Sequence, residues 1–235
     1  MNDGAALVKM AQKTWKVSQF WNEFETMLLE AVRKNSYQGV KLLLEHELKL
    51  EDSAQSSALN GSATSSSASY SKGKNTSSVI LAAKNGNLNL LKLFLKYNYT
   101  IPPPHYTDCQ CHKCTADKLR QSKHRIETMK ALSNPYWISL TSDDPFLTAF
   151  KLRNLSEKFG AEDDSCENQY VSIAKQNVEF CLELLDEIET EAECICLMKH
   201  KKYKEERGED VAFINMAIEY EQKEVYYKGV FNFIF

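Results

Sequence analysis

The feature that most constrains the fold of this chain is an ungapped internal repeat. Residues 31–44, AVRKNSYQGVKLLL, align with residues 82–95, AAKNGNLNLLKLFL, at an offset of 51 residues (82 − 31 = 51). In both copies a small or apolar pair precedes a short polar turn, and an apolar run with helical spacing follows the turn. Each copy therefore predicts two short amphipathic helices, over residues 24–35 and 37–48 in the first copy and 77–86 and 87–98 in the second.

The repeated pattern resembles the helix–turn–helix of ankyrin repeats, which recur about every 33 residues. The longer offset is accounted for by a Ser-, Ala- and Gly-rich insert at residues 53–78, which has almost no large apolar side chains and is expected to be a disordered loop. Two interpretations of this insert remain: an insertion that the fold tolerates, or a regulatory loop that is phosphorylated. Because repeats bury their faces on neighbours, two repeats need further helices at their ends, and residues 17–27 are a candidate cover.

The rest of the chain also favours helices over strands, so the sequence predicts an all-α fold. Asp144 followed by Pro145 is typical of a helix start, and Gly160 is a candidate helix stop. Further helices are expected at residues 117–132, 167–189, 191–200 and 209–225, with a turn at 133–137.

Composition and charge exclude several function classes. The net charge of −3 gives no overall attraction to nucleic acid. No apolar run approaches the roughly 18 residues needed to cross a bilayer, and residues 1–16 have no signal-peptide core, so the chain as given is expected in the cytoplasm. No phosphate-binding Gly loop or nucleophile motif occurs, and Asp143 and Asp144 fit helix capping better than acid–base chemistry, so an enzyme is not expected.

A Cys- and His-rich segment, HYTDCQCHKC at residues 105–114, is the strongest candidate site. Thiols stay reduced in the cytoplasm, where clustered cysteines favour metal or redox chemistry over disulfides. His105, Cys109, Cys111 and Cys114 offer the four ligands that a structural Zn²⁺ site needs, with no open position for a substrate. His112 is the other candidate imidazole, disfavoured because it is crowded between two cysteines. A loop that is Cys-rich without binding metal stays open.

Three further segments are weaker candidates for a functional role. Cys194, Cys196 and His200 form either a second metal cluster or, preferably, part of a buried apolar helix. The basic stretch 199–207 is either a solvated face or a contact for anionic lipid. The apolar residues 226–235 either anchor at an interface or are a divergent tail.

Residues 102–152 resemble the cytosolic N-terminal region of TRPC-type transient receptor potential channels. The likeness rests on the His/Cys loop, the basic SKHR at 122–125, KALSNP at 130–135 and ISLTSDDPFLTAF at 138–150. Including AIEYEQKEV at 217–225, the resemblance covers about residues 24–225.

The resemblance implies a domain order and a metal site. It implies a partial ankyrin-repeat array at 24–101, a zinc loop at 102–116 and a linker-helix domain at 117–225, between an N-terminal segment (1–23) and a divergent tail (226–235). It also implies that His105, Cys109, Cys111 and Cys114 bind structural zinc.

The function implied is that of a cytosolic assembly and regulatory region of a calcium-permeable, non-selective cation channel of store- or receptor-operated type. Its partners would be other channel subunits, in a homo- or hetero-tetramer in the plasma membrane, together with cytosolic regulatory proteins. Only two of the family's four repeats are recognisable, and no membrane portion is present in the sequence, so the chain is taken for a fragment or truncated form. The alternative is a free-standing, zinc-stapled ankyrin module that binds other proteins.

Overall fold

The structure is a computed structural model that describes residues 22–58, 76–198 and 212–234. All regular structure within these ranges is helical and no strand occurs in them, which confirms the all-α prediction. The chain divides into two compact units, Met1–Pro102 and Pro103–Phe235.

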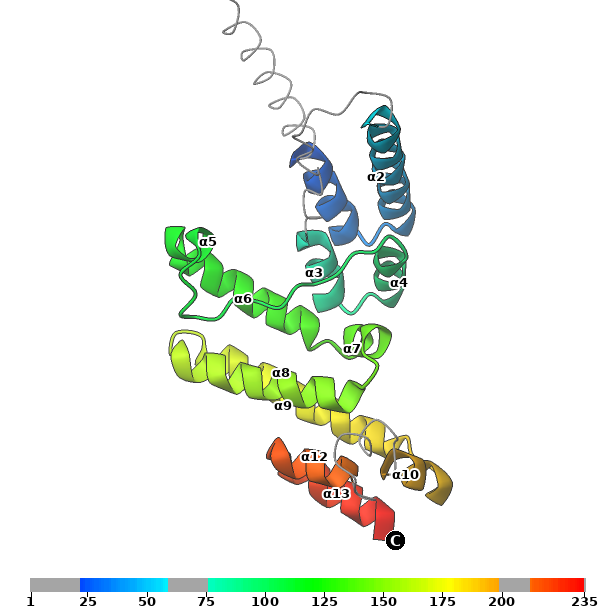
Figure 1. Cartoon of the computed structure of the whole chain (residues 1–235), viewed down its shortest axis with the longest axis vertical. Coiled ribbons are helices and arrows are strands. Elements are labelled where there is room, and N and C mark those ends of the chain that lie inside the picture. Colours follow the sequence, from blue (N-terminus) through cyan, green and yellow to red (C-terminus); the bar gives the residue numbers. More distant parts are fainter. Residues whose placement is uncertain (1–21, 59–75, 199–211, 235) are drawn as a thin grey trace, which may run out of the picture. The chain divides into compact units, whose positions relative to one another are not determined.

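The first unit contains two helix–turn–helix pairs (Figure 1). Residues 22–33 form a helix that is followed by α2 (Tyr37–Ala58), and α3 (Ser77–Lys84) is followed by α4 (Leu88–Lys96). Both ends of the predicted insert at 53–78 are therefore helical: residues 53–58 belong to α2, and residues 77–78 belong to α3. Helix α2 extends into the insert because no Gly or Pro interrupts it after Gly39. The middle of the insert and residues 17–21 of the candidate cover lie outside the described residues.

The turns of the two pairs have the same backbone conformation. Asn35 and Gly86, which the repeat aligns with each other, both have left-handed φ angles, of 53° and 63°. In each copy the next amide donates to a carbonyl in the last turn of the preceding helix (Ser36 to Ala31, 2.9 Å; Asn87 to Ala82, 3.1 Å). The side-chain amide of Asn87 donates to the side-chain oxygen of Asn35 and so links the two turns. The internal repeat is thus a repeat of structure, because glycine and asparagine tolerate this conformation.

Small residues let the helices of the second pair pack closely. Ala82 and Ala83 are both completely buried, and Leu91 and Phe94 of α4 are buried as well. At the end of this unit the Tyr99 hydroxyl donates to buried Glu47 of α2 at 2.8 Å, which satisfies a carboxylate that would otherwise be costly to bury.

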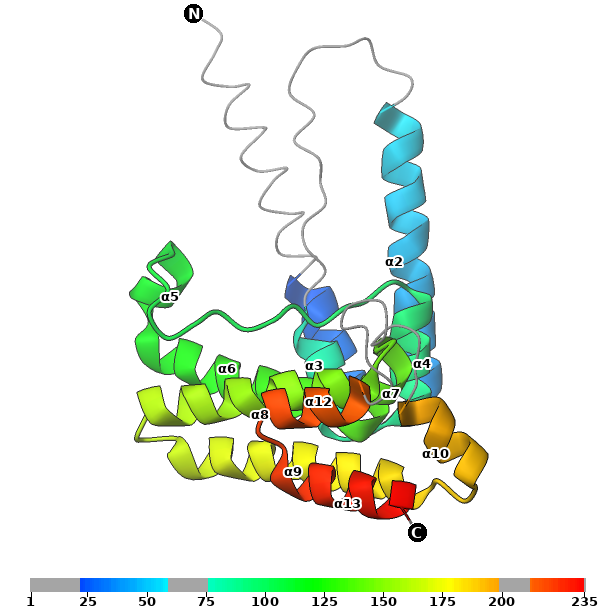
Figure 2. The same ribbon diagram turned by 60° about the horizontal axis from the view of Figure 1, so that its bottom comes forward.

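The second unit is organised around an antiparallel helical hairpin formed by α8 (Pro145–Glu162) and α9 (Glu167–Asp186), which run side by side in Figures 1 and 2. Helix α6 (Lys118–Leu132), which precedes the hairpin in the sequence, packs against both of its helices. Helix α13 (Lys223–Ile234), which follows the hairpin, packs along α9. The helices that complete this unit are α5 (His112–Ala116), α6 (Lys118–Leu132), α7 (Pro135–Thr141), α10 (Glu191–Met198), α12 (Ala212–Glu219) and α13 (Lys223–Ile234).

Side-chain caps define where three of these helices begin. The Asp144 carboxylate accepts from the Leu147 amide at 3.0 Å, which confirms its predicted capping role. Asp117 caps α6 in the same way. The predicted turn at 133–137 was wrong in part, because Asn134 caps the short helix α7 and Pro135 occupies its first turn.

Gly160 does not stop helix α8, contrary to the sequence prediction. The helix continues to Glu162, and Gly160 is buried against α9. A Cβ atom at this position would lie 3.3 Å from the Cβ of Tyr170, which is tighter than most Cβ contacts. The glycine therefore serves the close approach of two helices and not a chain reversal.

The single helix predicted at 209–225 is two helices in the described residues. It breaks at Glu221, which has a left-handed φ of 55°, and the Gln222 amide donates back to Ala217 at 2.7 Å. Helix α13 then runs through the expected boundary at residue 225, and Tyr226 packs on the core of the unit. Residues 226–234 therefore continue this helix.

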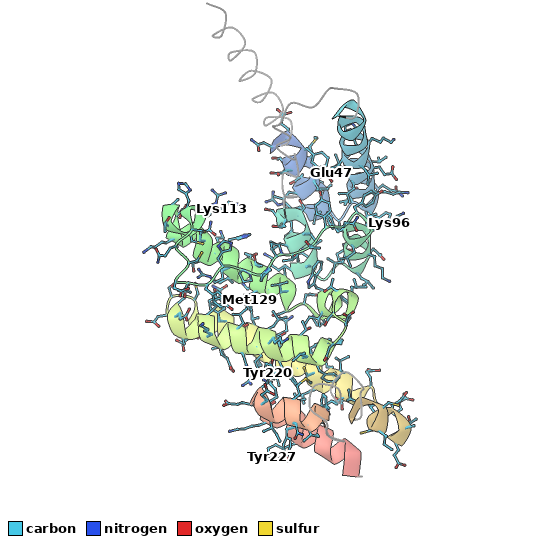
Figure 3. The ribbon with its side chains drawn as sticks, viewed as in Figure 1. Glu47, Lys96, Lys113, Met129, Tyr220 and Tyr227 are labelled. Carbon is cyan, nitrogen blue, oxygen red and sulfur yellow. The ribbon has the colours of Figure 1, made fainter. Side chains whose placement is uncertain are left out.

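Two apolar clusters hold the second unit together. One joins α6 to the hairpin through Met129, Phe159 and Tyr170, all fully buried; Met129 is labelled on α6 in Figure 3. The other joins the hairpin to the C-terminal helices, where the rings of Phe146 and Phe213 meet edge-to-face at 5.0 Å. In the part of the chain that the structure describes, no helix has the length and apolarity that a membrane span requires.

Candidate metal site

The structure brings the four predicted ligands together. The ligand atoms of His105, Cys109, Cys111 and Cys114 all lie within 4.8 Å of one another. The Nδ1 atom of His105 is 3.2 Å from the Cys109 sulfur and 3.4 Å from each of the other two sulfurs. His112, the alternative imidazole, is exposed on α5 and does not belong to this group.

Local backbone interactions create this arrangement. Prolines 102–104 keep the approach extended, and the Cys109 amide then closes a turn by donating to Tyr106 at 3.2 Å. Cys111 directly precedes α5, and the Cys114 amide donates to its carbonyl at 3.0 Å. One helical turn therefore sets the last two cysteines on the same side, while the preceding turn returns His105 and Cys109 to them.

The donor set fits a tetrahedral zinc ion. Zn–S bonds of about 2.3 Å and Zn–N bonds of about 2.0–2.1 Å at tetrahedral angles place nitrogen and sulfur about 3.6 Å apart. The three N–S distances of the cluster are within a few tenths of an ångström of that value. Three thiols and one imidazole are also the ligand types that zinc prefers in structural sites. Four protein ligands leave no position for a substrate.

Comparison with known proteins relates the chain to one family. Residues 109–163, from the first cysteine of the cluster to the end of α8, match the family described as Transient receptor ion channel II. The human and mouse proteins named Short transient receptor potential channel 4 are each 30% identical over 205 residues, or 84% of this chain and 20% of the relative. A Transient-receptor-potential-like protein of Caenorhabditis elegans is 31% identical over 210 residues, or 83% of this chain and 20% of that protein.

The chain is a homologue of the TRPC-type transient receptor potential channels. It spans about one fifth of the length of the curated relatives that it matches.

The thiols of this TRPC homologue differ in acidity when no metal is bound. Hydrogen bonds from Cys114, first from its backbone and then from its side chain, lower the pKa of the Cys111 thiol to about 6. Burial, and then the neighbouring Cys111 and Cys109, raise the pKa of Cys114 to about 11. Cys111 therefore ionises before Cys114, and Cys114 stabilises its negative charge.

We expect this difference to appear in alkylation of the metal-free protein at pH 7. At this pH a larger fraction of Cys111 than of Cys114 is ionised, and the thiolate is the nucleophile, so Cys111 should react faster than Cys114. Iodoacetamide labelling followed by peptide mass spectrometry measures both rates. Equal rates would contradict the assignment, and added zinc should protect both cysteines.

The other sequence candidates do not come together in the described residues. Cys194 is buried in the core of the second unit, whereas Cys196, two residues further along α10, is exposed. His200 lies outside the described residues. Cys194 thus agrees with the predicted buried apolar helix, whereas Cys196 does not. The basic stretch 199–207 is likewise outside the described residues, and Asp143 is exposed beside the capping Asp144.

The residues that support the cluster from outside are not among the candidates that the sequence predicts. Arg125 on α6 donates to the backbone of the loop, and Thr107 donates to Glu162 at the end of α8. In the sequence, the basic segment 122–125 stands out only as part of the family resemblance. The signal available in the sequence was Arg125 beside Ile126 on the apolar side of a helix, where a charged residue needs a partner.

Proposed function

We propose that this chain is the cytosolic assembly and regulatory region of a TRPC-type, calcium-permeable cation channel, in which His105, Cys109, Cys111 and Cys114 hold a structural zinc ion. The observation that carries the proposal is the convergence of these four ligand atoms within 4.8 Å, in a chain related to transient receptor potential channels over more than four fifths of its length.

The zinc ion would act as a staple and not as a catalyst. It would join the extended segment before the cluster, which carries His105, to the start of α5, which carries Cys111 and Cys114. Bonds from one ion to four ligands would stabilise the shape of a loop whose one large ring, Tyr106, is about half exposed, because metal binding and folding are coupled. The rigid loop would then present α6 and the α8–α9 hairpin as one assembly surface.

The first unit would contribute an ankyrin-like array. The support is the repeated helix–turn–helix with its two equivalent left-handed turns at Asn35 and Gly86. Repeat arrays offer extended surfaces to protein partners, so this unit would contact neighbouring subunits or cytosolic regulatory proteins. The partners proposed are subunits of a homo- or hetero-tetramer in the plasma membrane, with this region on the cytoplasmic side.

Co-expression with a full-length TRPC-type channel tests the assembly role. We expect the chain to co-purify with the channel and to reduce whole-cell calcium-permeable current severalfold, because mixed tetramers replace complete ones. Cys111→Ser should weaken both effects, whereas Cys166→Ser, which changes a cysteine outside the cluster, should leave them unchanged.

A folded chain that neither co-purifies with the channel nor alters its current would contradict this role. That result would favour the alternative, a free-standing zinc-stapled module that binds other proteins.

A further inference from the structure

The environment of one buried arginine links the His/Cys cluster to the helical hairpin. Arg125, on α6, is only 8% exposed. Its Nε atom donates to the backbone carbonyl of His105 at 2.9 Å, and one terminal nitrogen lies 3.5 Å from the carbonyl of Tyr106. A guanidinium presents its donors in a rigid fork, so two adjacent carbonyls are held in a defined orientation.

The same guanidinium contacts the hairpin. Its central carbon lies 5.4 Å from the centre of the Phe159 ring on α8, within range of a cation–π interaction. Its charge also lowers the pKa of Asp163 in the α8–α9 turn, after the larger effects of hydrogen bonds from Ser122 and Ser165. Arg125 thus touches the cluster on one side and the end of the hairpin on the other.

Other side chains of the loop and of α6 also contact this end of the hairpin. Thr107 of the loop donates to Glu162, and Ser122 of α6 donates to Asp163. The Tyr106 ring meets Phe159 at 6.0 Å and lies under the ammonium group of Lys158 at 4.8 Å. Residues 106 and 107, which directly follow the predicted ligand His105, are therefore held against α8 by several side-chain contacts.

We infer that Arg125 is a positioning residue for the metal site: it holds the backbone of His105 so that the imidazole faces the three thiols, and it transmits metal occupancy to the α8–α9 turn. The inference rests on the proposed metal binding. Two physical effects support the role. The fork fixes the peptide that carries the one nitrogen ligand, and its positive charge offsets the excess negative charge of three thiolates around one divalent ion.

Arg153 supplies a matched control within the same unit. Like Arg125, it is a partly buried arginine that reaches two consecutive backbone carbonyls, those of Tyr220 and Glu221, each at 3.4 Å. Those carbonyls belong to the turn between α12 and α13. Lysine at either position keeps the positive charge and loses the planar guanidinium group.

The test compares Arg125→Lys with Arg153→Lys in the full 235-residue chain. Zinc affinity is measured by competition with a chelating indicator, and site geometry by the absorption spectrum of the Co²⁺-loaded protein. We expect Arg125→Lys to raise the zinc dissociation constant about tenfold, the lower end of the range for residues that support metal ligands, and to alter the Co²⁺ spectrum. Arg153→Lys should change neither quantity, even where both variants lower the melting temperature equally.

Hydrogen exchange of the unmodified chain gives a second measurement that does not depend on a variant folding. Because coupling between two sites is reciprocal, zinc removal should speed exchange at residues 163–166 and not at residues 220–222. The role of Arg125 would be overturned if the unmodified chain bound zinc and both lysine variants bound it with equal affinity. It would also be overturned if zinc removal left hydrogen exchange at residues 163–166 unchanged. Failure of the unmodified chain to bind zinc at all would instead overturn the metal site.

Discussion

Replacing Cys111 with serine is expected to abolish zinc binding and to lower the melting temperature of the second unit by about 10 °C or more. A ligand at about a thousand times its dissociation constant stabilises the folded state by about 4 kcal/mol. A change of 1 kcal/mol shifts the melting temperature of a domain of this size by about 2–4 °C or somewhat more. Purified, freshly reduced protein should therefore carry about one zinc per chain, and a strong chelator should reproduce the effect of the substitution.

Two control variants separate this effect from general damage. His112→Ala removes an exposed imidazole next to Cys111 that does not belong to the cluster, and Cys166→Ser removes a thiol elsewhere in the unit. Both should keep the zinc content and the melting temperature of the unmodified chain. Metal analysis of the reduced protein that finds no zinc above background would refute the site.

Replacing Phe213 with alanine is expected to destabilise the second unit by about 3–5 kcal/mol. Truncation of a buried phenylalanine removes its transfer free energy and leaves a cavity that the surroundings fill only in part. Phe213 is completely buried, and its ring packs edge-to-face on Phe146 of α8. Denaturant unfolding measures the change, and hydrogen exchange of α8 shows whether its amides lose protection together with those of α12.

The matched control lies on the same helix. Ile218 of α12 is 55% exposed, so Ile218→Ala should change the free energy of unfolding by no more than about 0.5 kcal/mol. If Phe213→Ala cost less than about 1 kcal/mol, the C-terminal helices would not share a core with the hairpin.

The sequence alone determined the features whose causes lie within a few neighbouring residues. The left-handed turns at Asn35 and Gly86 follow from residues that tolerate positive φ. The start of α8 follows from Asp144, whose side chain caps an amide three residues later. The four candidate ligands also lie within ten residues of one another. Their convergence needs only one turn and the start of a short helix, so their spacing was informative without knowledge of the fold.

Only the tertiary structure decided the features whose causes lie far apart in the chain. The sequence favours a helix stop at Gly160, whereas the structure shows that this glycine packs against Tyr170 of the antiparallel helix α9. The sequence did not reveal that Tyr226 packs on the apolar cluster that includes the hairpin. Arg125 has no evident role until a backbone carbonyl twenty residues earlier in the chain approaches its guanidinium. Burial and pairing depend on which helices meet, and that is a property of the packed unit which no local stretch of sequence contains.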